Sequence, residues 1–113
     1  MIQITNLTDE PNQRHTVIFE ESEIVVKLRF FPRHHFWSMD VVYGTYQVFG
    51  VKLSVGALHI ESGNQPFDFT VMDNSGNGID PYRINDFSNG RCSLYMFERA
   101  DMLLIRDGEA VPA

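Results

Sequence analysis

The chain has 113 residues, a formal net charge of −6, nine Lys and Arg residues and one cysteine. Double-stranded nucleic acid and anionic membranes are bound through clustered cations, so this charge balance argues against both as partners. One cysteine excludes an internal disulfide. The length predicts a single domain over residues 1–113, with a loosely ordered tail at about 106–113.

The first half of the chain alternates between apolar and polar residues. Short alternating segments predict strands at 2–7 and 14–20, and Glu20-Glu21-Ser22-Glu23 is expected at the tip of a hairpin. The clearest segment follows at 24–31, where apolar residues at every second position flank Lys27 and Arg29. A period of two places alternate side chains on opposite faces of a strand, one buried and one in water.

Further strands are predicted along the rest of the chain. One spans 36–43, with Trp37, Met39, Val41 and Tyr43 on one face, and the next spans 46–53, with a bulge or close contact at Gly50. Shorter strands are expected at 58–60, 67–71 and 92–98. Residues 99–106 fit either a short helical turn or an edge strand, and we favour the turn.

Seven to eight short strands without long helices between them predict an all-β fold, either a small antiparallel barrel or a sandwich. A parallel α/β sheet is excluded, because its strands need long crossover connections. One short helical turn near the C-terminus completes the prediction.

The polar loop that begins at Asp73 is a candidate calcium site. Oxygen-bearing side chains stand at Asp73, Ser75 and Asn77, and Gly78 follows, as in the first half of a calcium-binding loop. The twelfth position is Ile84, where a bidentate Glu is required. Asn and Gly are also common in turns, so an ordinary long connection is the favoured interpretation.

The histidines and the cysteine do not form a recognisable site. His34 and His35 are neighbours, whose side chains would point to opposite faces of a strand, and His15 and His59 are distant in sequence. Cys92 lies in an apolar segment and is expected to be buried rather than nucleophilic. No residue is therefore assigned to a catalytic, cofactor-binding or metal site.

Three apolar side chains are candidates for a protein interface. Val25 and Phe31 share a strand face with Lys27 and Arg29, and Phe36 points away from Trp37. Apolar side chains exposed on such a face are typical of protein–protein contacts. The alternative is a core that covers parts of both faces of the sheet.

Five segments between His15 and Phe97 carry a pattern whose order and spacing match a known family. They are 26–30, 36–40, the glycine-bracketed 50–56, Asp80-Pro81 with Asp86-Phe87, and Gly90 with Leu94-Tyr95. In these segments the chain resembles the phage baseplate plug proteins of contractile-tailed phages. Residues 99–113 depart from this pattern. The resemblance implies a virion structural protein without catalytic residues or cofactors.

The resemblance also implies partners and a location. The expected partners are other tail and baseplate proteins, namely tube, hub, tape measure or wedge subunits, with several copies per virion. Assembly would take place in the host cytoplasm. The alternative is a β-sandwich that binds protein or carbohydrate without catalysis, with Trp37, Tyr43, Tyr46 and Tyr82 as a sugar-binding surface. A small β-barrel enzyme would need a polar pocket, which no set of residues indicates.

Overall fold

The computed structural model describes residues 1–60 and 66–98, and these residues form seven β-strands. None of the described residues belongs to a helix that is long and apolar enough to cross a membrane. The strands are β1 (Ile2–Ile4), β2 (Asn12–Phe19), β3 (Ser22–Phe31), β4 (Phe36–Tyr43), β5 (Tyr46–Lys52), β6 (Asp68–Asp73) and β7 (Cys92–Phe97). The predicted all-β class is therefore confirmed. The helical turn or edge strand expected at 99–106 and the tail expected at 106–113 lie outside the described residues.

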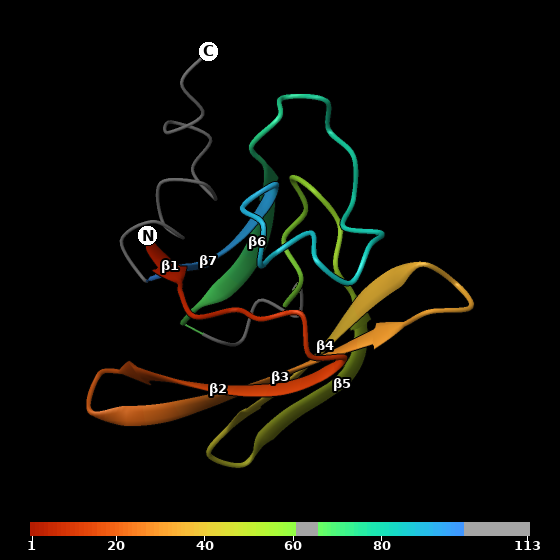
Figure 1. Ribbon diagram of the computed structural model, residues 1–113. Coiled ribbons are helices and arrows are strands. Elements are labelled where there is room, and N and C mark those ends of the chain that lie inside the picture. The colour runs from red at the N-terminus through yellow and green to blue at the C-terminus, as the bar shows by residue number, and fades with distance from the viewer. Residues whose placement is uncertain (61–65, 99–113) are drawn as a thin grey trace.

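The strands form two antiparallel sheets, one in the order β1-β7-β6 and the other in the order β2-β3-β4-β5. Figure 1 shows the four-stranded sheet below the three-stranded one, with the long β6–β7 connection to one side. No strand belongs to both sheets, so the arrangement is a sandwich and the alternative of a closed barrel was wrong.

The four-stranded sheet is a meander of hairpins, as the alternating segments predicted. The β2–β3 hairpin closes at the pair Phe19 and Ser22, with Glu20 and Glu21 between them at φ values of 48° and 67°. The β4–β5 pairing shifts register between Met39 and Val41, where the amide of Gly50 donates to a carboxylate oxygen of Asp40 over 2.7 Å. This irregularity confirms the bulge predicted at Gly50.

The core lies between the inner faces of the two sheets. The inward residues of β3 are fully or nearly buried, and Trp37, Met39 and Val41 of β4 are 0% exposed. Trp37 packs edge-to-face on Phe87, with 5.6 Å between ring centroids, and its indole N–H donates to the carbonyl of Arg83 over 3.0 Å. The tryptophan therefore joins the four-stranded sheet to the β6–β7 connection, and its hydrogen-bonding group is satisfied within the core.

The segment after β5 differs from the prediction. Residues 58–60 were expected as a strand, but they form an irregular segment beside β6. One carboxylate oxygen of Asp68 accepts the amides of His59, Ile60 and Phe69 over 2.7–2.8 Å. Asp68 is only 1% exposed, although the alternation of its strand would place it in water. Its carboxylate accepts the backbone amides that would otherwise bond to a neighbouring strand.

Candidate interaction face of the four-stranded sheet

Val25, Phe31 and Phe36 all lie on the outer face of the four-stranded sheet, away from the core. Their strand neighbours Val26, Phe30 and Trp37 point inward and are buried. The three candidates are half-buried by neighbours on their own face. The structure thus brings the predicted residues to one surface, and their contact with a partner remains a prediction.

Phe31 and Phe36 form one aromatic pair at the end of the β3–β4 hairpin. They are direct partners in the ladder, and their rings stack with centroids 4.8 Å apart and an interplanar angle of 21°. The guanidinium of Arg29 lies 5.6 Å from the Phe31 ring centroid, and the ammonium of Lys52 lies 5.9 Å from that of Phe36. Cation–π attraction holds both charged groups beside the pair.

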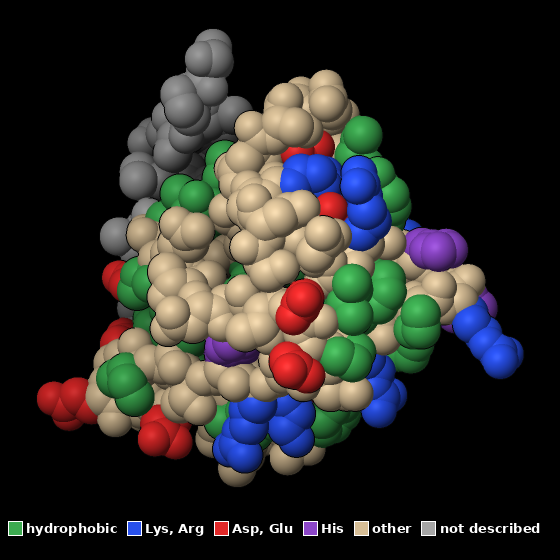
Figure 2. Space-filling view, viewed as in Figure 1, with side chains coloured by type: hydrophobic (Ala, Val, Ile, Leu, Met, Phe, Trp, Pro, Cys, Tyr) green, Lys and Arg blue, Asp and Glu red, His purple; other side chains and the backbone are tan. Residues whose placement is uncertain are grey.

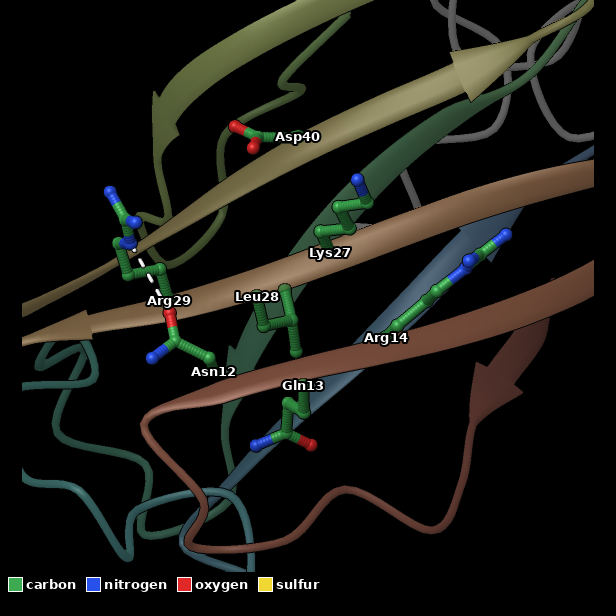
Figure 3. Close-up of a pocket in the computed structure, with 7 residues that line it drawn as sticks. All are labelled: Asn12, Gln13, Arg14, Lys27, Leu28, Arg29 and Asp40. Carbon is green, nitrogen blue, oxygen red and sulfur yellow. Dashed lines mark hydrogen bonds between the residues drawn. The ribbon is translucent and has the colours of Figure 1, made fainter.

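A groove of about 400 Å³ crosses the middle of this face. Figure 3 shows Arg14, Lys27 and Arg29 on the neighbouring strands β2 and β3, with Asp40 on β4 next to them. The Nε of Arg29 donates to Asn12 Oδ1 over 3.2 Å, the contact marked in Figure 3. The groove is lined by Asn12, Gln13, Arg14, Lys27, Leu28, Arg29 and Asp40.

Charges are unevenly distributed over the surface. In Figure 2 Lys and Arg side chains gather along the lower side of the molecule, over the four-stranded sheet. Acidic side chains gather at the lower left, where the tip of the β2–β3 hairpin lies in Figure 1. Among the described residues Arg14, Lys27 and Arg29 form no ion pair with a carboxylate, and Asp40 is the acidic residue that lines the groove with them.

The loop considered as a calcium site has its acidic oxygens already occupied. Asp73 Oδ1 accepts the amide and the hydroxyl of Ser75 over 2.9 and 2.6 Å, while Oδ2 accepts the amide of Ile79 and lies 3.3 Å from Arg91 Nη1. The hydrogen bonds from the Ser75 side chain and the Ile79 backbone lower the pKa of Asp73 to about 2. Within the described ranges no three His, Cys, Asp or Glu side chains are grouped to hold a metal. These contacts favour the ordinary connection.

The tightest polar cluster of the loop was not predicted. Asp86, with a fully buried side chain, accepts the amides of Tyr82 and Arg83 over 2.8 Å and two hydrogen bonds of 2.9 Å from Arg91. Burial acts to raise the pKa of Asp86, but the hydrogen bonds from Arg91 and from the two amides outweigh it and lower the pKa. The guanidinium also donates to the carbonyls of Ile79 and Asp80.

The cluster therefore holds the loop in one shape. Sequence reasoning missed it, because an Asp and an Arg five positions apart in a turn-rich segment indicate no particular contact.

The remaining candidates have packing roles. Cys92 is 2% exposed, as expected, and burial raises the pKa of its thiol to about 11. His59 Nε2 accepts the amide of Ser54 over 2.9 Å, and its Nδ1 lies 2.8 Å from the carbonyl oxygen of Phe69. His34 and His35 are exposed in the β3–β4 turn.

The proposed sugar-binding surface is not assembled. Trp37 is in the core, and Tyr43 packs edge-to-face on Phe67 with 5.1 Å between centroids. Tyr82 lies in the β6–β7 connection, where two arginines stack over its ring. Burial of Trp37 removes the largest ring from any exposed platform.

One protein-family model matches the chain over both sheets of the sandwich. The family model described as Cyanophage baseplate Pam3 plug gp18 matches residues 1–99, which include all seven strands. A search of curated proteins found no match. The family match is longer than the resemblance from His15 to Phe97, since it begins at residue 1 and includes β1.

Proposed function

The chain belongs to the family described as Cyanophage baseplate Pam3 plug gp18, and from this membership we propose that it organises neighbouring tube and hub subunits during tail assembly. Membership of the family makes it a structural protein of the baseplate. The observation that carries the proposal is the match over residues 1–99, which spans both sheets and the loop between β6 and β7.

The outer face of the four-stranded sheet is the proposed contact surface. It presents Val25 and the stacked pair of Phe31 and Phe36 beside cations that have no carboxylate partner in the described ranges. Apolar side chains surrounded by polar ones are typical of subunit interfaces. If these residues belonged to a core, another layer of this chain would cover the outer face. The three-stranded sheet packs on the inner face instead.

The outermost strands of the larger sheet offer a second kind of contact. β2 and β5 each pair on one side within the described residues, so their other edges can accept a strand from a neighbouring subunit. The edge of β6 is different, because residues 55–59 already bond to it through Gly56 and His59. We therefore propose β2 and β5 as the edges that tube, hub, tape measure or wedge subunits would extend.

We propose no catalytic role for the chain. The acidic groups with lowered pKa values, Asp73 and Asp86, bond to Arg91 and to loop amides and so stabilise the connection. We also propose that several copies are built into each virion.

The test is the composition of purified virions and the behaviour of variants in them. Mass spectrometry of purified particles is expected to find the chain, and phage lacking its gene are expected to assemble no complete tails. Complementation with F31A/F36A is expected to fail, whereas M72A, a change at an exposed residue of β6 (46% exposed), is expected to restore assembly. Absence of the chain from virions would contradict the proposal, and normal tails with F31A/F36A would contradict the assigned surface.

A further inference from the structure

The outer face of the four-stranded sheet is arranged in transverse rows. Cα partners across the strands define them: first Thr16, Val25, Val42 and Gln47, then Arg14, Lys27 and Asp40, then Asn12, Arg29, Ser38 and Lys52, then Phe31 and Phe36. Successive rows are two residues apart, which is roughly 6.8 Å along a strand. Two cationic rows therefore lie between a row with two valines at its centre and an aromatic row.

The charge of this face opposes the charge of the chain. The chain carries a formal net charge of −6, yet its cationic rows contain one carboxylate, Asp40. That carboxylate is half-buried, and one of its oxygens accepts the Gly50 amide. Arg14, Lys27 and Arg29 are exposed and have no carboxylate partner among the described residues. The face is thus complementary to an acidic partner.

Part of this face is held in position before any partner arrives. Arg29 is held between Asn12 Oδ1 and the Phe31 ring, and Lys52 lies beside the Phe36 ring. Ordering a long side chain on binding costs conformational entropy, so restraint in the free protein lowers that cost.

A protein partner fits this face better than a nucleic acid. Bases bind to exposed rings by stacking on a free face, but Phe31 and Phe36 stack on each other and have cations beside them. The side chains of Val25 and Val42 offer nothing to a phosphate backbone, and the net charge of the chain repels one. Carboxylates flanked by apolar side chains match all four rows.

We infer that this face binds an extended acidic segment of another baseplate protein, in which alternate side chains are apolar, acidic, acidic and apolar. An extended segment running along β3 presents same-side residues at the spacing of the rows. Its carboxylates meet the rows of Lys27 and Arg29, and its apolar ends meet Val25 at one side and the Phe31–Phe36 pair at the other. The inference names the partner chemistry of the surface in the proposed function and rests on it.

The test is an NMR titration of the full chain with the peptide Ser-Leu-Ser-Glu-Ser-Glu-Ser-Leu-Ser at millimolar concentration. We expect amide shifts confined to β2, β3, β4 and β5, at least about tenfold weaker binding by K27E/R29E, and unchanged binding by R83E. The control peptide has Lys in place of both Glu residues and is expected to give no shifts. If K27E/R29E loses its dispersed spectrum, K27Q/R29Q replaces it, with the same direction of change.

Several outcomes overturn the inference. These are no shifts with the acidic peptide, equal shifts with the Lys peptide, shifts outside this face, or tighter binding of a short random-sequence DNA duplex than of the peptide. The titration is independent of particle assembly. A chain that is present in virions but ignores the peptide contradicts this inference alone, whereas a chain absent from virions contradicts the proposed function.

Discussion

Arg91 and Asp86 face each other at the base of the β6–β7 connection, with Nε and Nη2 of the guanidinium each 2.9 Å from a different carboxylate oxygen. The same arginine lies 3.3 Å from Asp73 at the end of β6, and the carbonyl of Asp86 accepts the amide of Cys92 at the start of β7. The pair therefore joins both ends of a long loop to its middle, and a bidentate guanidinium is suited to this because its donors are fixed in one plane.

Replacing Arg91 by alanine is expected to lower the free energy of unfolding by about 3 kcal/mol, since it leaves the buried carboxylate of Asp86 without its counter-charge. R91K is expected to be intermediate, because an ammonium cannot form the paired hydrogen bonds. R83A is the matched control. The side chain of Arg83 is 57% exposed, and its Nε lies as far as 4.0 Å from Asp86 Oδ1. Loss of this weak contact should cost less than about 1 kcal/mol. Urea unfolding measures all three, and equal effects of R91A and R83A would contradict the assignment.

The stability of the protein is expected to fall in acid. The pKa of Asp73 drops from an ordinary 3.8 to about 2 in the folded state, and that of Asp86 is also lowered. A lowered pKa means that the unfolded chain binds the proton first, so the stabilisation is complete above pH 3.8 and declines toward about pH 2. The midpoint of urea unfolding, measured across this range, should fall less steeply in D73N than in the natural chain. Parallel curves for the two proteins would refute this prediction.

A more stable hairpin should result from E21G. Glu21 has a φ of 67° in the two-residue turn between β2 and β3, a conformation that glycine adopts without strain. Relief of that strain is expected to raise the free energy of unfolding by about 1 kcal/mol, after allowance for the greater freedom of glycine in the unfolded chain. E23G is the control, since Glu23 lies within β3 and glycine there should be destabilising. Destabilisation by both changes would show that the turn is not strained.

Cys92 is expected to resist thiol reagents in the folded protein. Its side chain is buried and burial raises the thiol pKa to about 11, so little reactive thiolate is present at neutral or mildly alkaline pH. Labelling with a disulfide reagent should be slow in buffer and fast in concentrated urea, and the folded rate should rise in R91A as the adjoining loop loosens. Fast labelling of the natural folded chain would contradict the buried position.

Much of the fold was evident from local patterns. The alternation in β3 and β4 correctly placed Trp37 and Leu28 inside and Lys27 outside, and Gly50 marked the bulge. These features are local, because the direction of a side chain in a strand depends on its position and not on its partner. The resemblance to baseplate plug proteins was likewise confirmed by the family match.

Other features depend on contacts between distant parts of the chain. Period alone could not separate a barrel from a sandwich, since both need the same alternation and differ in how edge strands pair. Residues 58–60 looked like a strand, but the carboxylate of Asp68 takes up the amides that a ladder would use.

The sequence by itself determined most of the strands and their inner and outer faces, because these depend on a two-residue periodicity, and it indicated the family through the resemblance of its segments to baseplate plug proteins. The tertiary structure alone decided that Phe31 stacks on Phe36 with Arg29 and Lys52 beside the pair, and that Arg91 closes on Asp86. The reason is physical: the strength of a charge or a ring contact depends on distance and burial, and both are set by which strands become neighbours.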